Sequence, residues 1–130
     1  MDEIRPYPRP PELDQLAESI TRQLQDAGIP SSLNGGDGAG GATVEVDVDE
    51  DGPGGVHVSW KTSKHLRDNV WALIQQGESS SPLVQHYGVV NSAMRDAILE
   101  ILLSSGFSAS TSDDSDLSPF TVYVELPSTR

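Results

Sequence analysis

The chain has 130 residues, a formal net charge of −12 at neutral pH and no cysteine. Its length suits a single domain with one hydrophobic core. The acidic balance disfavours nucleic acid and anionic membranes as partners, and the lack of cysteine excludes disulfides, thiolate metal sites and cysteine nucleophiles. The chain start has no secretory leader pattern and no apolar run is long enough to span a bilayer, so we expect a soluble, cytoplasmic protein. Two lysines against six arginines, with abundant Asp, Gly and Ala, suggest a bacterial source.

The first half of the chain predicts an arm, a helix and a strand hairpin. Residues 1–10 are rich in proline and predict an extended arm, and residues 11–127 a single α+β domain. Apolar residues recur at helical spacing over 13–27, with Gly28 placed to end that helix. A short strand is expected at 29–33. The main elements that follow are the alternating strands 44–48 and 56–60, joined by a Gly- and Pro-rich turn.

The second half predicts two more helices and a final strand. Ser63 is a natural N-cap for a helix whose inner face holds Leu66, Val70, Leu73 and Ile74. Residues 78–91 read as irregular or briefly helical, with Pro82 suited to a first turn. A third helix is expected from about Met94 to Gly106, and an alternating strand at 122–126.

An internal repeat emerges when the sequence is shifted against itself by 78 positions. The shared unit is a helix, a capping glycine, a short strand, a polar loop and an alternating strand. Chance similarity between amphipathic elements is the alternative. The aligned pairs are Ile20/Ile98, Leu24/Leu102, Gly28/Gly106, Thr43/Thr121, Val44/Val122 and Val46/Val124.

Together these elements predict an α+β fold in the order αβββ(αα)ββ. We expect a mainly antiparallel sheet of three to five strands with two or three helices packed on one face, because the strands alternate between apolar and polar residues. The acidic positions of the strands would then face water.

The most distinctive polar stretch lies at the start of the second helix. It gathers three of the eight cations of the chain next to hydroxyl groups and free helix N–H groups, a combination that can hold a phosphate or carboxylate. The alternative is that these cations merely neutralise the acidic surface nearby. The candidate anion site consists of Lys61, Thr62, Ser63, Lys64, His65 and Arg67.

A second candidate site is the acidic segment Asp47–Gly52, which matches the first half of a calcium loop. Asp47, Asp49 and Asp51 alternate before a glycine turn, as oxygen ligands for a hard cation do. Position twelve of the loop is Val58, where a bidentate glutamate is required, and strands rather than helices flank it. The alternative is an acidic strand edge that discourages aggregation.

Other motifs are weaker. Gly36–Gly41 fits the dinucleotide-binding glycine pattern but precedes a strand, so it reads as a linker. His57, His65 and His86 are scattered without zinc-ligand spacing. The third helix is apolar almost all round, which leaves Leu99 and Leu103 for a second internal contact or a subunit interface.

The sequence therefore favours a non-enzymatic interaction or regulatory module that needs no cofactor. We expect a protein partner or self-association, with a small anionic ligand at Lys61–Arg67 as the alternative and calcium binding as a weaker one.

Overall fold

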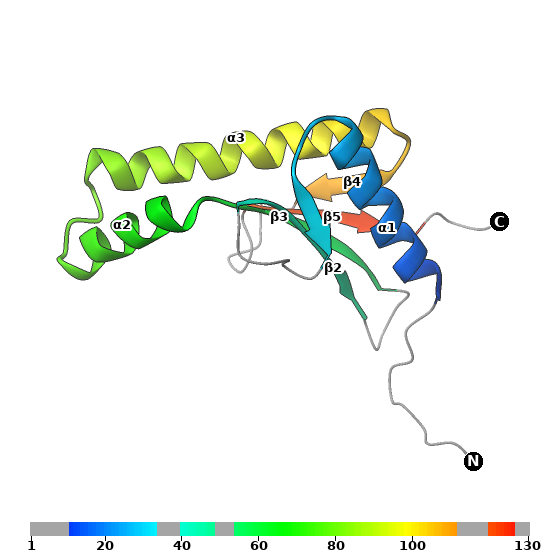
Figure 1. Cartoon of the computed structure of the whole chain (residues 1–130), viewed down its shortest axis with the longest axis horizontal. Coiled ribbons are helices and arrows are strands. Elements are labelled where there is room, and N and C mark those ends of the chain that lie inside the picture. The colour runs from blue at the N-terminus through cyan, green and yellow to red at the C-terminus, as the bar shows by residue number, and fades with distance from the viewer. Residues whose placement is uncertain (1–10, 34–39, 49–53, 112–119, 127–130) are drawn as a thin grey trace, which may run out of the picture.

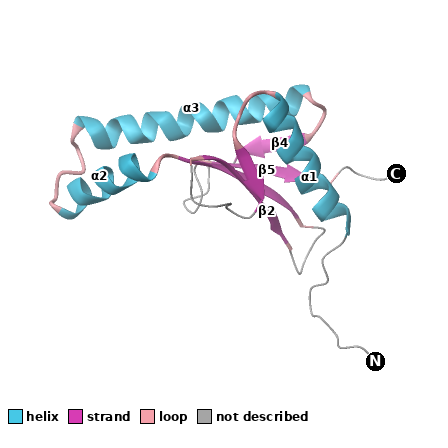
Figure 2. Ribbon diagram, in the orientation of Figure 1, coloured by secondary structure: helices cyan, strands magenta, loops and turns pink. Residues whose placement is uncertain are grey.

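The computed structural model of the chain describes residues 11–33, 40–48, 54–111 and 120–126. The expected arm lies outside these ranges, as does most of the hairpin turn. The fold is α+β, as predicted, with helices gathered on one side of a single sheet (Figures 1 and 2). The elements are α1 Pro11–Asp26, β1 Ser31–Leu33, β2 Gly41–Asp47, β3 Gly55–Lys61, α2 Lys64–Gln75, α3 Pro82–Ser104, β4 Ser108–Thr111 and β5 Thr121–Glu125.

The sheet has five strands in the order β1-β2-β3-β5-β4. Strands β2 and β3 form the predicted antiparallel hairpin, with Val44 opposite Val58. The pairs β3–β5 and β4–β5 are also antiparallel, and only β1–β2 is parallel. A mainly antiparallel sheet is thereby confirmed, with β1 and β4 as its two edges.

The core lies between one face of the sheet and the helices α1 and α3. Because side chains alternate between faces along a strand, every second residue of the inner strands points to the same side, and these positions are valines. They pack against apolar residues of α1 and of the C-terminal half of α3. The fully buried members of this core are Leu13, Ile20, Leu24, Val44, Val56, Val58, Ile98, Leu102, Val122 and Val124.

The helices α1 and α3, which the sequence repeat aligns, end in the same way. Gly28 and Gly106 follow the two helices with φ angles of 92° and 96°, in the left-handed region that favours glycine. The N–H of the next residue then reaches back to a helix carbonyl, from Ile29 to Leu24 at 2.9 Å and from Phe107 to Leu102 at 3.1 Å. Helix α2 ends with the same pattern, since Gly77 has a φ of 81° and the N–H of Glu78 bonds the Leu73 carbonyl oxygen at 2.9 Å, so the shared helix end is not by itself a sign of duplication.

The repeat does not extend to the pairing of the short strands. Strand β1 runs parallel to β2, whereas β4 runs antiparallel to β5. Strands β2 and β5 both lie antiparallel to β3, on either side of it, and so run in the same direction. The two aligned segments share the helix end, the core positions and the alternating strand, and they differ in how their short strands pair.

The third helix is longer than the sequence pattern predicted. Helix α3 runs without a break over 23 residues from Pro82, so the irregular segment expected up to residue 91 was wrong from residue 82 onward. Ser81 caps the helix by accepting a hydrogen bond from the N–H of Val84 at 3.4 Å, and Pro82 fits the first turn. Gly88 lowers helix propensity without ending the helix, because α2 packs along this half of α3.

Helices α2 and α3 form a hairpin that extends beyond the sheet (Figure 1). Among the described elements, α2 contacts α3 alone, so two helices rather than three cover the sheet. Val70 is the single buried side chain of α2. Ile74 was predicted to face inward, but it is 41% exposed because no element of the sheet reaches this end of the hairpin.

Candidate functional site

The start of α2 is fixed by ordinary helix capping. The Ser63 hydroxyl accepts a hydrogen bond from the N–H of Leu66 at 3.2 Å. The preceding residue, Thr62, is buried, and its carbonyl oxygen accepts a bond from Nε of Arg67 at 3.2 Å. Lys61 is the last residue of strand β3. The predicted N-cap is thus confirmed, and its hydroxyl and the Arg67 Nε are both committed to the local backbone.

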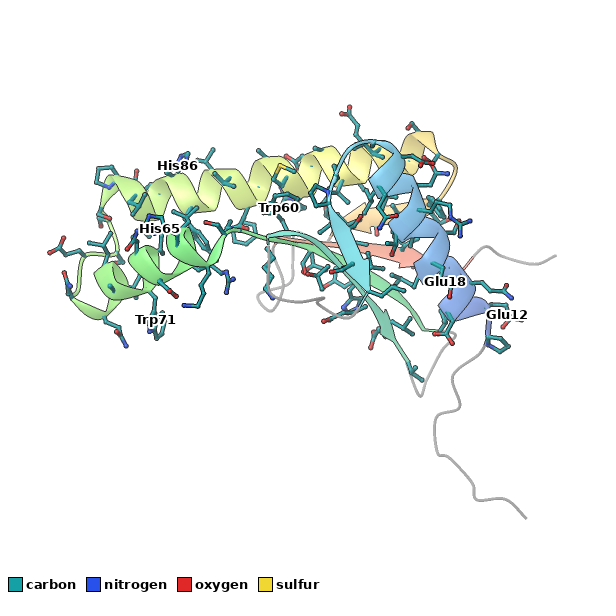
Figure 3. All side chains as sticks on the ribbon, viewed as in Figure 1. Glu12, Glu18, Trp60, His65, Trp71 and His86 are labelled. Atoms are coloured by element: carbon teal, nitrogen blue, oxygen red, sulfur yellow. The ribbon has the colours of Figure 1, made fainter. Side chains whose placement is uncertain are left out.

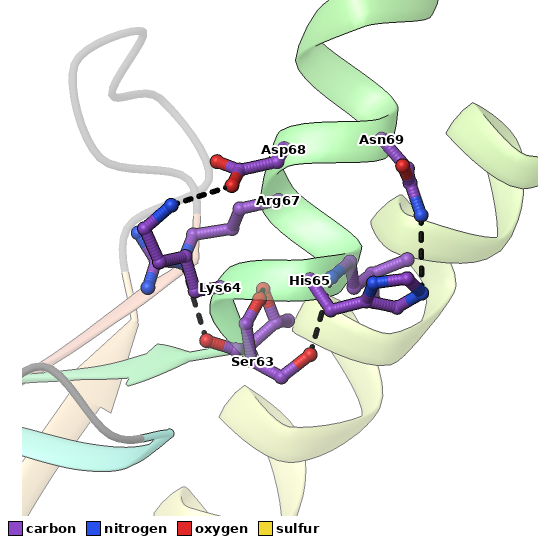
Figure 4. Close-up of polar contacts among 8 residues, drawn as sticks. Ser63, Lys64, His65, Arg67, Asp68 and Asn69 are labelled. Atoms are coloured by element: carbon purple, nitrogen blue, oxygen red, sulfur yellow. Dashed lines mark hydrogen bonds and ion pairs between the residues drawn. The ribbon is translucent and has the colours of Figure 1, made fainter.

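The cations and the histidine of this segment lie on opposite sides of the helix (Figure 4). Nζ of Lys64 donates to Oδ2 of Asp68 at 2.7 Å, on the same side as Arg67. His65 faces the other side, with its Nε2 3.2 Å from Nδ2 of Asn69. The hydrogen bond from the Lys64 ammonium lowers the pKa of Asp68, because it stabilises the charged carboxylate. The six candidate residues are therefore contiguous but do not converge on one point.

The exposed side of α2 carries a second pattern that the sequence reasoning missed. Lys64, Arg67, Trp71 and Ile74 follow one another at intervals of three, four and three positions, which places them along one helix face. Trp71 is 60% exposed and lies on the side of α2 away from α3 (Figure 3). We call these four residues the α2 stripe. The spacing from Lys64 was the signal that could have revealed it.

The acidic residues predicted to bind calcium are only partly described. Asp47 ends β2, and its Oδ2 lies 3.2 Å from Nε2 of His57 on the neighbouring strand. Asp49 and Asp51 lie outside the described residues. Within the described part of the chain, no three histidine, aspartate or glutamate side chains are grouped as metal ligands would be. Calcium binding stays a prediction, with Asp47 already engaged by a histidine.

A small polar cluster on the open face of the sheet was also missed. His57 stands opposite Glu45 on β2 and opposite Tyr123 on β5. The rings of His57 and Tyr123 meet edge to face with centroids 4.8 Å apart. Asp47 and Tyr123 thus hold the imidazole from two sides on an open surface. Only the pairing of β3 with β5 brings Tyr123 here, so no local motif could reveal the cluster.

The two candidate interface leucines differ in exposure. Leu103 is 49% exposed near the end of α3, whereas Leu99 is half-buried and packs against the core. An open hollow of about 330 Å³ lies between α1 and the turn from α3 to β4. Polar and apolar residues line this hollow, and Glu125 is the single charged residue among them. The lining residues therefore do not form a catalytic arrangement.

No protein-family model, curated protein or solved structure matches this chain. Within the described residues, no helix has the length and apolar character needed to cross a membrane. The functional argument therefore depends on the surfaces described above.

Proposed function

We propose that this chain is a non-enzymatic protein-interaction module that binds its partner along the α2 stripe. The observation that carries the proposal is Trp71, a large aromatic side chain 60% exposed on a projecting helical hairpin. Ile74 on α2 and Val89 on α3 are exposed on the same hairpin. Single exposed apolar residues are common on protein surfaces, but a tryptophan aligned with an arginine is typical of interface hot spots.

The chemistry of the stripe indicates the kind of partner. Lys64 and Arg67 form its N-terminal half, and Trp71 and Ile74 its C-terminal half. In a chain with a net charge of −12, Lys64 and Arg67 together with the adjacent Asp68 leave one net positive charge next to an apolar surface. An acidic segment with an apolar anchor would be attracted to the cations and would bury its anchor against Trp71. A cysteine-free chain suits the reducing cytoplasm, where we place this interaction.

A binding role is favoured over a catalytic one by what the polar side chains already do. Ser63 caps α2, Arg67 holds the Thr62 carbonyl, and Lys64 pairs with Asp68. With the Ser63 hydroxyl and the Arg67 Nε bonded to the local backbone, these groups support the helix start rather than act on a substrate.

Replacing Trp71 with serine is expected to weaken partner binding by at least about tenfold, because the main apolar anchor is removed. Partners retained from source lysate by the wild-type chain would be identified by mass spectrometry and then titrated against each variant by calorimetry. Leu33→Ser is the matched control, since Leu33 is 38% exposed on the edge strand β1, which does not contact α2. Equal affinity of wild type and Trp71→Ser for every identified partner, or repeated failure to retain any partner, counts against the proposal.

A small anionic ligand is the second candidate, favoured by the positions of Lys61, Lys64 and Arg67, which lie within seven residues of one another around the start of α2. Asp68→Asn should strengthen phosphate binding by roughly two- to fivefold, because it releases Lys64 from its carboxylate partner. Thermal melts with phosphate at matched ionic strength would measure the affinity, and adding Arg67→Ala to Asp68→Asn should remove the increase in phosphate affinity. Arg22→Ala on α1 makes the same charge change at a distance. An Arg67→Ala protein that phosphate stabilises as strongly as wild type would exclude this site.

A further inference from the structure

The C-terminal part of α3 and strand β4 form a region without charge. Residues 101–112 include no Asp, Glu, Lys or Arg, although the chain as a whole carries a net charge of −12. Within this run, β4 exposes Ser108 and Ser110 on the open face of the sheet. Two copies of so acidic a chain repel each other across most surfaces, and this strip adds no charge of its own to that repulsion, although Glu125 of β5 lies opposite Ser108.

Strand β4 is also an edge strand without the protection that edges usually have. It pairs with β5 on one side, and no described residue bonds its other side. It contains neither charge nor proline, the common devices against edge-to-edge pairing. Strand β1 also contains neither, but the side-chain amide of Gln25 donates to its Ser31 carbonyl oxygen at 3.2 Å. Among the described residues, β4 is therefore the edge without such a bond.

The exposed leucine of α3 lies beside this edge. The Ser105 hydroxyl donates a hydrogen bond to Oε1 of Gln23 on α1 at 3.3 Å. Ser105 therefore marks the side of the α3 C-terminus that faces α1. Leu103 is two positions earlier and points about 200° away around the helix. Helix α3 contacts β4, β3 and β5, whereas α1 contacts β1, β2 and β3, so the side of α3 turned away from α1 is the side toward the β4 edge. Half-buried Leu99 lies one turn earlier.

We propose that the chain forms a symmetric dimer through β4, with two copies of the strand pairing antiparallel across a twofold axis. The two five-stranded sheets then become continuous, and Leu103 of each copy packs across the axis above the new strand pair. A second copy is the occupant because an uncharged strand pairs with itself without repulsion, and a twofold axis brings each exposed leucine to its equivalent. The α2 stripe lies on the projecting hairpin and takes no part in this contact.

Sedimentation of the full chain tests the dimer. Leu103→Glu is expected to raise the dimer dissociation constant by at least about tenfold, since it places two carboxylates at the twofold axis. Leu33→Glu adds the same charge at a similarly exposed leucine on the other edge and should leave the constant within about twofold, because it lies outside the contact. Trp71→Ser should likewise leave it unchanged, which separates this inference from the proposed function. Higher salt should strengthen association by screening the acidic chains.

Because the natural chain has no cysteine, single cysteines report the contact directly. Under mild oxidation Ser110→Cys should yield a covalent dimer, since antiparallel pairing brings β4 residues of two copies within disulfide range, whereas Ser32→Cys on β1 should not. A chain that stays monomeric at millimolar concentration overturns the inference. So does a dimer that Leu103→Glu leaves intact and Ser110→Cys does not crosslink. Crosslinking of Ser110→Cys to a different protein in place of itself would show that β4 receives a foreign strand, which also overturns it.

Discussion

Replacing Leu102 with alanine is expected to lower the free energy of unfolding by about 2–5 kcal/mol. Leu102 is fully buried and packs in the core between α3 and the sheet. Truncation removes its transfer free energy and leaves a cavity that the surrounding valines fill only in part. Because small domains are stable by about 5–15 kcal/mol in total, this single change removes a large share. Urea unfolding followed by circular dichroism measures it.

The neighbouring residue provides the control. Leu103→Ala makes the same chemical change one position along α3, but Leu103 is 49% exposed and should lose less than about 1 kcal/mol. Leu24→Ala should match Leu102→Ala, because Leu24 occupies the equivalent buried position at the end of α1. Similar losses at residues 102 and 103 would show that the helix does not bury the face described above.

Gly41→Ala is expected to be the second large effect, with a loss of about 2–4 kcal/mol from backbone strain and steric overlap together. Gly41 has a φ of 134°, which residues with a side chain rarely adopt. A methyl group there would lie 2.5 Å from the Pro30 carbonyl oxygen. That oxygen cannot easily move, because it accepts the Ala42 N–H at 2.8 Å where β1 joins β2. Thermal and urea unfolding would both report the loss.

Gly88→Ala should have the opposite sign. Gly88 lies inside α3, and a methyl group there would meet nothing within 4 Å. Alanine in a helix interior is about 0.5–1 kcal/mol more favourable than glycine, so this variant is expected to be more stable than wild type. Destabilisation by both variants would contradict the local geometry assigned to one of the two glycines.

The parts of the fold that depend on local pattern were predictable. Alternation marked the β2–β3 hairpin, and Ser63 and Gly28 marked a helix start and a helix end, because capping and strand faces depend on residues close in sequence. The start of α3 was missed because Gly88 and the branched Val89 and Val90 lower helix propensity, which the contact with α2 overrides.

The candidate site was predictable only in its capping geometry. An amphipathic pattern shows that one face of α2 is buried but not what covers it, so the departure of α2 from the sheet and the exposure of Trp71 and Ile74 were not foreseen. The meeting of His57 with Tyr123 depends on strands separated by two helices in the chain. Pairing at such sequence distance leaves no periodic signal.

The continuous α3 helix gives the molecule two regions of unequal cooperativity. Its C-terminal half is part of the core through Ile98 and Leu102, whereas its N-terminal half packs against α2 in the projecting hairpin. Since Val70 is the single buried side chain of α2, detaching that helix exposes little apolar surface and leaves the sheet intact. We therefore expect the α2–α3 hairpin to open locally while the rest of the fold stays intact. A partner bound along α2 would stabilise the closed hairpin, so that binding and the local folding of this hairpin are coupled.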